Sequence, residues 1–316
     1  MRAERVKMHA RAIGFDLVGV APPSVPDGFA RYDAAMDAGY GADMGWLSEK
    51  RALRQDVRNV HPSAQAVVAL GVNHYAPTPG YLEAPPSAEE GWIARYAQGK
   101  DYHVVIRKML VRLVKAFEAD PALGGSSFDH RIFVDTGPVL EKAFAHRAGI
   151  GWIGKNALLL NREHGSWVFL AVVLTPLVLA FDSAEVDHCG SCTRCLDACP
   201  TDAFPEPYVL DARRCIATWT IESRAPERDI VPEELGQHVF GCDICQEVCP
   251  WNRKVPETGH ASLAPRPENV RPRLDSLAHL SQDMFKRRFP KSAVRRTDAT
   301  RLNQVIQLIN ARNRSS

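Results

Sequence analysis

Two stretches of the chain place apolar residues at the spacing of an amphipathic helix. One covers residues 2–13 and stops at Gly14, and the other runs from Tyr102 to Ala119. Pro138 suits the first turn of a helix, so the segment after it predicts a third helix that reaches Gly149. The first half of the chain is therefore expected to hold at least three helices.

Apolar runs typical of buried strands lie between these helices. They cover residues 16–20, 66–72 and 131–134. Residues 156–161 and 167–175 predict a hairpin around the polar turn at 162–165, and the proline-rich stretch 76–90 predicts a loop. Because helices and strands alternate irregularly, we expect an α/β or α+β layered domain in the first 180 or so residues.

Length and composition restrict the class of protein. A chain of 316 residues usually forms two or three domains, and its 45% apolar and 24% charged residues indicate a folded globular protein. The longest apolar run, 167–180, contains a proline and is shorter than the roughly 20 residues that a membrane-spanning helix needs. The amino terminus has no signal-peptide pattern. We therefore expect a cytoplasmic protein with no membrane partner.

The net charge of +2 conceals a basic carboxyl-terminal segment. Between Lys286 and Ser316 the chain has nine Lys or Arg and one acid, Asp298, so this segment carries +8 and the rest −6. Such a segment is a candidate contact for nucleic acid or another polyanion. A solvated basic helix face is the alternative interpretation.

All eight cysteines lie between Cys189 and Cys249. A disulfide scaffold is disfavoured because the chain is long and has no signal peptide. The first group has the C-x2-C-x2-C-x3-C-P spacing that binds a [4Fe-4S] cluster, and the fourth cysteine of such a run ligates the other cluster in two-cluster ferredoxins. Its members are Cys189, Cys192, Cys195 and Cys199.

The second group repeats this run without its first cysteine. Its members are Cys242, Cys245 and Cys249, and Cys215 is the remaining cysteine that can complete it. Exchange of the last cysteine of each run predicts one cluster on Cys189, Cys192, Cys195 and Cys249, and a second on Cys215, Cys242, Cys245 and Cys199. A pair of structural zinc sites is the alternative. It is disfavoured because tetrahedral zinc does not need two cysteine runs that each end in Cys-Pro.

The sequence pattern does not decide the roles of Asp135 and of a glycine motif at 149–154. Asp135 follows a predicted strand and precedes a predicted helix, so it is either a helix N-cap or a proton donor at the edge of a buried site. Gly149-Ile-Gly151-Trp-Ile-Gly154 matches a dinucleotide motif, but it follows a helix and precedes a strand, which is the wrong order. We expect instead that the backbone there approaches a flat or bulky ligand.

Several segments together resemble epoxyqueuosine reductases. They are Val134-Asp-Thr-Gly-Pro-Val-Leu-Glu-Lys142, Tyr96-Ala-Gln-Gly-Lys-Asp-Tyr-His103, Gly149-Ile-Gly-Trp-Ile-Gly-Lys-Asn156, Leu210-Asp-Ala-Arg-Arg-Cys215, the cysteine runs and Cys249-Pro-Trp-Asn-Arg253. The resemblance extends from about Gly14 to Arg253. It implies an oxidoreductase that depends on cobalamin and two [4Fe-4S] clusters and reduces epoxyqueuosine to queuosine at the wobble position of tRNA.

The resemblance also implies an architecture and site residues. An α+β, nitroreductase-like cobalamin-binding domain is expected at 1–181, a ferredoxin-like two-cluster domain at 182–256, and a short basic helical tail at 257–316. Asp135 occupies the place of the family's proposed proton donor. The expected cobalamin contacts are Arg58, Tyr102, His103, Lys155, Asn156 and Trp219.

The tail is shorter than the helical-repeat domain of longer family members. Residues 284–289 and 301–313 are expected to be its helices, and its basic residues to bind the phosphates of the anticodon arm. We hypothesise that Arg287, Arg288, Arg295 and Arg296 contribute to this binding. An unidentified electron donor and a monomeric state are further expectations. Two alternatives stay open: a corrinoid reductive dehalogenase acting on small molecules, and an electron carrier without enzymatic activity.

Overall fold

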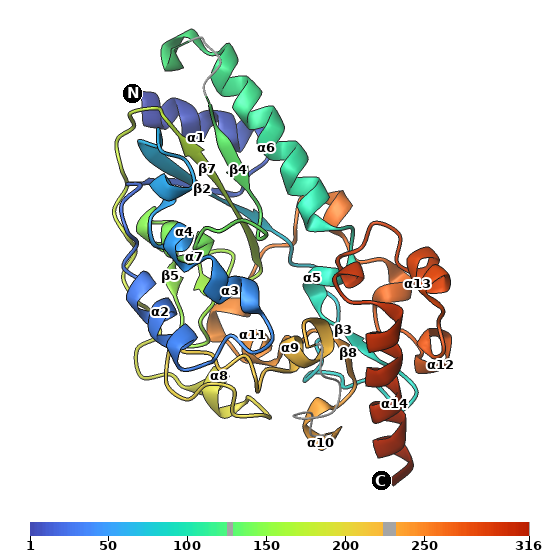
Figure 1. The fold of residues 1–316 in the computed structure, drawn as a ribbon. Helices are drawn as coiled ribbons and strands as arrows, with labels where there is room; N and C mark the ends of the chain where they lie inside the picture. Colours follow the sequence, from blue (N-terminus) through green and yellow to red (C-terminus); the bar gives the residue numbers. More distant parts are fainter. Residues whose placement is uncertain (125–128, 224–231, 316) are drawn as a thin grey trace.

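A four-stranded antiparallel sheet forms the centre of the amino-terminal part (Figure 1). The computed structural model describes residues 1–124, 129–223 and 232–315. The strand order is β1-β2-β7-β4. These strands are β1 (Leu17–Ala21), β2 (Ala66–Asn73), β4 (Arg131–Phe133) and β7 (Val168–Thr175). The strands predicted at 16–20, 66–72, 131–134 and 167–175 are thus confirmed within one or two residues.

Both faces of the sheet are covered, as the middle strand β2 demonstrates. All eight of its residues are buried. Val68 and Leu70 belong to the core under α1 and α6, whereas Val67 and Ala69 belong to the core under α7. Successive side chains of a strand point to opposite faces, so a run of apolar residues without polar alternation can fill two cores at once.

Helices α1 (Arg2–Ile13) and α6 (Tyr102–Ala119) pack together on one face (Figure 1). α1 ends at Gly14, whose φ of 108° favours glycine. Both helices have the bounds that the sequence predicts. Arg5 and His9 of α1 contact the carboxylate of Asp120, the residue that follows α6, and so connect the two helices.

Helix α7 (Glu141–Arg147) covers the other face and starts later than predicted. Pro138 does not open it, because residues 134–139 form a series of bends. The helix predicted between Pro138 and Gly149 is therefore too long at both ends.

The predicted hairpin between 156–161 and 167–175 is wrong. β6 (Leu159–Leu160) pairs with β5 (Trp152–Ile153), whereas β7 pairs with β2 and β4. The side chain of Asn161 accepts hydrogen bonds from two backbone N–H groups of the turn, and the chain on either side enters a different sheet. Strand pairing depends on these distant partners and not on the turn alone.

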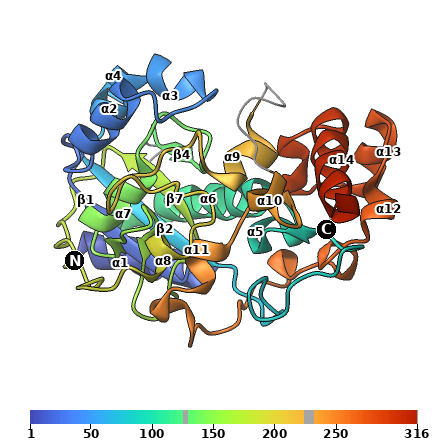
Figure 2. The same cartoon turned by 90° about the horizontal axis from the view of Figure 1, so that it is seen from below.

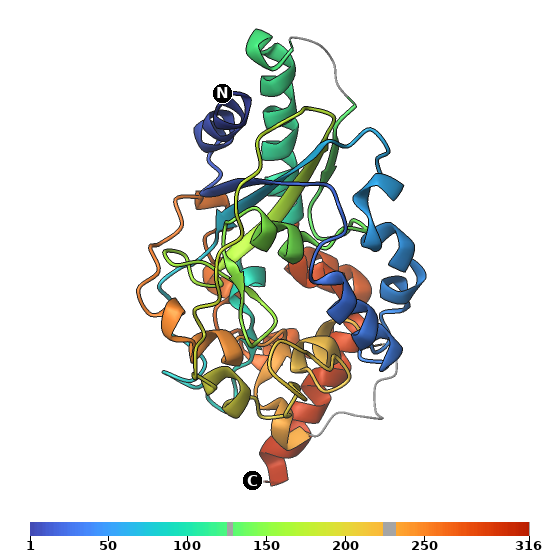
Figure 3. The same cartoon turned by 90° about the vertical axis from the view of Figure 1, so that its left-hand side faces the viewer.

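Three short helices lie beside the sheet and reach the cysteine-bearing segment. They are α2 (Phe29–Asp37), α3 (Gly45–Glu49) and α4 (Arg51–Gln55). Figure 3 shows these blue helices extending from the sheet toward the yellow and orange segments. The backbone N–H of Ala212 donates to Tyr40 O, and the Arg213 guanidinium lies over the Tyr40 ring. The amino-terminal and cysteine-bearing parts are thereby connected.

The remaining helices and strands lie in the cysteine-bearing segment, in the carboxyl-terminal region and in the segment 92–98 (Figure 2). They are β3 (Trp92–Ile93), α5 (Arg95–Gln98), α8 (Arg194–Asp197), α9 (Ile216–Ile221), α10 (Pro232–Leu235), β8 (His238–Phe240), α11 (Ile244–Glu247), α12 (Leu274–Leu277), α13 (Gln282–Arg288) and α14 (Ala299–Ser315). The two predicted carboxyl-terminal helices are confirmed as α13 and α14.

The carboxyl-terminal region is packed into a core of its own. Leu302, Val305 and Ile309 of α14 are buried with Trp219 of α9 and Phe240 of β8. β3, from the amino-terminal part of the chain, pairs in parallel with β8. The domain bounds at 181 and 256 stay a prediction, and the segment around β3 contributes to the second core. Within the described residues, no helix has the length and apolar character that a membrane crossing requires.

Candidate functional site: a large cavity beside the cysteines

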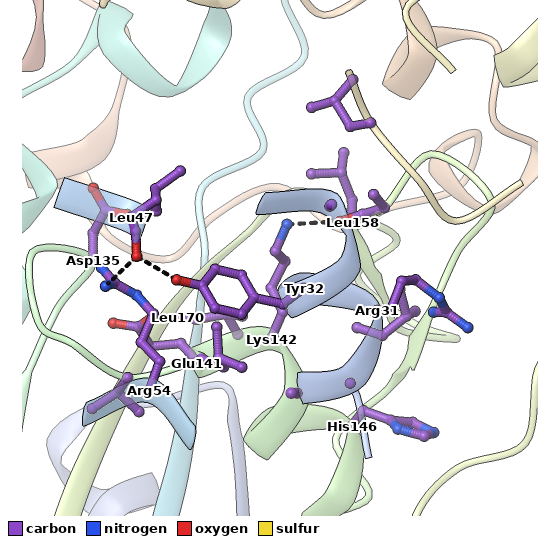
Figure 4. A pocket seen from close by; sticks show the side chains of 18 of the residues that line it. Arg31, Tyr32, Leu47, Arg54, Asp135, Glu141, Lys142, His146, Leu158 and Leu170 are labelled. Carbon is purple, nitrogen blue, oxygen red and sulfur yellow. Dashed lines mark hydrogen bonds between the residues drawn. The ribbon is translucent and has the colours of Figure 1, made fainter. Parts of the chain in front are cut away.

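A cavity of about 910 Å³ lies between α2, α4 and α7 and extends to the segment after β4 (Figure 4). We call it the large cavity. Its lining combines apolar side chains of β7 with aromatic rings such as Tyr32 and Trp46. The charged residues of its lining include Arg31, Arg54, Asp135, Glu141, Lys142, Glu222 and Arg296. An apolar cavity with a few placed polar groups is the usual form of a cofactor site.

Asp135 reaches the large cavity through an unusual turn. The backbone N–H of Thr136 donates to Val134 O at 2.6 Å, which closes a γ-turn centred on Asp135 with φ 59°. A non-glycine residue in this region is strained, and such strain concentrates at functional sites. The residue that precedes α7 is Leu140, so the N-cap interpretation of Asp135 is wrong.

Two side chains at the start of α6 hold the Asp135 carboxylate. Tyr102 donates its hydroxyl to Asp135 Oδ2 at 2.9 Å, and His103 Nε2 lies 3.4 Å from the same oxygen. The other ring nitrogen of His103 lies 2.9 Å from Asp101 Oδ1, so Asp101, His103 and Asp135 form a chain. The Tyr102 ring is stacked between His103 and Phe169, which fixes its direction.

The pKa values of His103 and Asp135 place the proton on the imidazole of His103. The contact with His103 lowers the pKa of Asp135 and outweighs burial, which acts in the other direction. Burial lowers the pKa of His103, but its contacts with Asp101 and Asp135 outweigh this and raise the pKa to about 9. At neutral pH the pair therefore holds one proton, available at the edge of the large cavity.

Glu141 is a cavity residue that the sequence analysis missed. It begins α7, and burial raises its pKa to about 8. Its Oε1 has no hydrogen-bond partner among the described residues. Figure 4 shows Glu141 near Arg54 and Lys142, and the Lys142 ammonium donates to Ala157 O at 2.7 Å. A neutral, unpartnered carboxyl group beside a cavity is suited to bind an amide or hydroxyl of a ligand.

Four of the cysteines line a second cavity of about 240 Å³, which we call the cysteine cavity. These residues are Cys189, Cys192, Cys195 and Cys249. Cys249 comes from the second run, as the predicted exchange requires. No three His, Cys, Asp or Glu side chains in the part of the chain that the structure describes converge on a point suited to one metal ion. The spacing favours a multi-iron cluster over a tetrahedral zinc site.

The other four cysteines form a neighbouring group. Electrostatic interactions connect Cys245 with Cys215 and Cys199, and Cys242 with Cys245 and Cys215. Cys245 also interacts with Cys195 of the cysteine cavity, so the two groups adjoin. Adjacent clusters at these positions would form a path for electrons.

Two predicted cofactor contacts lie at the cysteine cavity and not at the large one. The Lys155 ammonium donates to the backbone oxygens of Gly190 and Cys192, and so fixes the loop that carries the first cysteines. Asn156 Nδ2 lies 3.4 Å from Cys245 O. Both side chains line the cysteine cavity, so their geometry connects them to the cysteine loops.

The structure does not bring two other predicted contacts to the large cavity. The Arg58 guanidinium is half exposed and held by Asp56, whereas Arg54, four residues earlier, lines the cavity. Trp219 is buried and donates its indole N–H to Arg213 O. Of the residues near Trp219, Glu222 lines the cavity.

An ion pair between Glu222 and Arg296 connects the carboxyl-terminal region to the large cavity. Arg296 Nε lies 2.8 Å from Glu222 Oε1, and its guanidinium lies over the Trp46 ring. The sequence analysis missed Arg54 and Trp46 because their approach to the cavity depends on the packing of α2–α4. It assigned Arg296 to phosphate binding, but the structure pairs it within the protein.

The glycine motif is explained by the protein's own backbone. A Cβ atom at Gly149 would lie 2.4 Å from Ser183 O, and one at Gly151 would lie 2.2 Å from Leu160 O. The motif follows α7 and contains β5, the order that disfavours a dinucleotide site. The expectation that the backbone of this motif also approaches a ligand stays a prediction.

Family models match two parts of the chain. The model described as "4Fe-4S double cluster binding domain" matches residues 188–252, which contain all eight cysteines. The model described as "Epoxyqueuosine reductase QueG, DUF1730" matches residues 54–136, which end just after Asp135.

Known proteins resemble the chain over most of its length. An epoxyqueuosine reductase of Synechocystis is 41% identical over 298 residues, which cover 92% of this chain and 99% of that protein. A crystal structure of epoxyqueuosine reductase with an epoxyqueuosine-modified tRNA stem loop has a TM-score of 0.86 at 30% identity, over 99% of this chain and 82% of the other. The Bacillus subtilis enzyme, with its catalytic aspartate loop swung out of the active site, has a TM-score of 0.84 at 29% identity and the same coverage.

Proposed function

The chain belongs to the epoxyqueuosine reductase family, and we propose that it reduces epoxyqueuosine in tRNA to queuosine with Asp135 as the proton donor. Removal of the epoxide oxygen as water consumes two electrons and two protons. The protein must therefore deliver both to a single position on a bound nucleoside. Family membership favours this reaction over reduction of small organohalides or simple electron transport.

The placement of Asp135 is the observation that carries the proposal. Its carboxylate reaches the large cavity from a strained γ-turn and contacts His103, which holds a proton at neutral pH. The proton that His103 holds can pass through the Asp135 carboxylate to a leaving oxygen, without waiting for solvent. Strain in the turn would favour movement of the Asp135 loop. In the Bacillus subtilis relative, the catalytic aspartate loop is swung out of the active site.

Cobalamin is the cofactor that we propose for the large cavity. The volume of about 910 Å³ suits a bulky ligand, and Arg31, Arg54 and Lys142 provide cations for its phosphate and amide oxygens. The unpartnered Oε1 of Glu141 fits the amides at the corrin edge. Bound cobalamin would supply a low-valent cobalt nucleophile. This assignment also supports a nitroreductase-like amino-terminal domain.

Two [4Fe-4S] clusters are the proposed source of electrons. The cysteine cavity holds one set of four thiols, and the adjoining group holds the other. The double-cluster family model covers both sets. Lys155 and Asn156 act through the loops that carry these cysteines, and an external electron donor is the proposed partner that reduces the clusters.

The tRNA anticodon arm is the proposed partner of the carboxyl-terminal region. Lys286 and Arg287 of α13 are exposed, as are Lys291 and Arg295 beyond it. Phosphate contacts need such freely accessible cations. These four residues suit an electrostatic contact better than Arg288 and Arg296, which are bound within the protein.

Anaerobic turnover of tRNA tests the proposal. Protein loaded with iron, sulfide and cobalamin is incubated with epoxyqueuosine-containing tRNA and a strong reductant, and nucleosides are analysed by mass spectrometry. Wild type should form queuosine, and Asp135→Asn should lose at least about 100-fold in rate. Asp129→Asn is the matched control, because Asp129 lies outside the cavity lining. A fully loaded wild type without turnover would contradict the activity, and an active Asp135→Asn would contradict the acid role.

A further inference from the structure

Trp152 separates the large cavity from the cysteine cavity. It is 1% exposed and is one of the residues that line the large cavity. Its ring makes edge contacts with His188 and Trp251, each with centroids 4.9 Å apart, and both partners line the cysteine cavity. Trp152 also packs in one apolar cluster with Cys249 and Cys189. One side chain therefore contacts both proposed cofactor sites.

The indole N–H of Trp152 is a buried donor without a partner. Its Nε1 has no hydrogen-bond partner, sulfur included, among the described residues. Cys189 packs against the apolar cluster that contains this ring. A thiol is a weak acceptor, whereas a sulfur that ligates iron carries negative charge and accepts hydrogen bonds readily. A buried donor without a conventional partner is costly unless such an acceptor is present.

The local backbone fixes the position of this ring. Trp152 pairs with Leu160 in the β5–β6 ribbon, and the absence of a side chain at Gly151 lets the two strands approach. Asn161 Nδ2 donates to Ile150 O and closes the same unit. The donor is thus held in place before a cluster binds, which makes its hydrogen bond inexpensive in conformational entropy.

We propose that Trp152 is a positioning residue that donates a hydrogen bond to the sulfur of Cys189 and sets the reduction potential of the cluster in the cysteine cavity. The inference rests on the cluster assignment made above. A donor to a ligating sulfur stabilises the reduced cluster, which carries one more negative charge, and so raises its potential. The ring also keeps water of the large cavity away from the cluster.

Redox titration followed by electron paramagnetic resonance tests the role of the N–H group. Trp152→Phe keeps an aromatic ring but loses the donor. The potential of one cluster should become more negative and that of the other should stay unchanged. A tenfold change in the reduction equilibrium corresponds to about 59 mV for a one-electron couple. Benzothienylalanine at position 152 keeps the ring volume without the N–H, and it should reproduce the shift if Trp152→Phe fails to fold.

Trp167→Phe is the matched control. Trp167 is also buried and its Nε1 has no partner among the described residues, but its ring lies against Tyr75 and His74 and does not line the cysteine cavity. This variant should leave both potentials unchanged. An unshifted potential in a position-152 variant with full iron and sulfide content would overturn the inference alone. A wild type that binds no clusters would overturn the cluster assignment and the inference together.

Discussion

His103 Nε2 lies 3.4 Å from Asp135 Oδ2, so the candidate acid of the site never acts as an isolated carboxyl group. The two residues share one proton at neutral pH. Asp101 contacts the other ring nitrogen of His103, Nδ1, and stabilises the imidazolium. The proposed proton donation therefore involves the histidine as well as the aspartate.

Replacement of His103 by glutamine should change the pH dependence of turnover. In the wild type, the pair retains its proton until the pH rises through about 9, so the rate should fall above that value. In His103→Gln, Asp135 must carry the proton alone, and an isolated carboxyl group loses it in the acidic range. We expect the decline to begin several pH units lower, with at least about a tenfold loss at pH 8.

The measurement is kcat between pH 5.5 and 10 at saturating tRNA. His9→Gln provides the control, because His9 also pairs with an aspartate, Asp120, but outside the cavity lining. Coincident profiles for wild type and His103→Gln would rule out the shared proton.

Glu141→Gln should stabilise the cofactor-free protein at neutral and mildly alkaline pH. Burial raises the pKa of Glu141 from 4.5 to about 8, so the native state holds a proton that the unfolded state releases. This contribution to stability is present below pH 4.5 and is lost as the pH rises to 8. Glutamine cannot ionise, so its advantage should grow across that window by at most about 1.4 kcal/mol per pH unit and then level off.

Urea unfolding of both proteins at several pH values between 4.5 and 9 measures this difference. Glu163→Gln, at an exposed position in the turn after β6, is the control and should show no such trend. A constant difference between Glu141→Gln and wild type across the window would contradict a buried neutral carboxyl group.

Removal of four exposed cations should weaken tRNA binding and its dependence on salt. The variant replaces Lys286, Arg287, Lys291 and Arg295 by alanine. Each lost phosphate contact should reduce the slope of log K against log salt by up to about 0.9. The affinity for a tRNA stem loop is measured by titration at several salt concentrations between about 50 and 200 mM, and the slope is taken from these values.

A second variant separates local contact from net charge. Arg107, Lys108, Arg112 and Lys115 of α6 are also exposed, and their replacement removes the same charge from a different surface. The slope should change less in this control. Equal changes in both variants would favour long-range attraction over contact with the carboxyl-terminal region.

The sequence predicted local patterns well and distant packing poorly. Cysteine spacing is a property of short loops, so the double-cluster segment could be recognised before any coordinates, whereas the exchange of ligands between the two runs stays a prediction. By contrast, Arg54 and Arg58 differ by four positions, and only the packing of α4 determines which of them meets the cavity. Trp152 lies within the glycine motif 149–154, where the sequence analysis considered the glycines and not the tryptophan. The strained turn at Asp135 has no signature in the residues that form it.

Single cysteine replacements should remove one cluster each and reveal the exchange between the two runs. If Cys249 completes the cluster of the first run, Cys249→Ser should lose the same cluster as Cys189→Ser and keep the other. Cys199→Ser should instead match Cys242→Ser, because Cys199 adjoins the second group. Mössbauer spectra and iron analysis should give about half of the wild-type iron for each variant. A spectrum of Cys249→Ser that matches Cys242→Ser would show that each run binds its own cluster, and the cysteine cavity would then need a different ligand set.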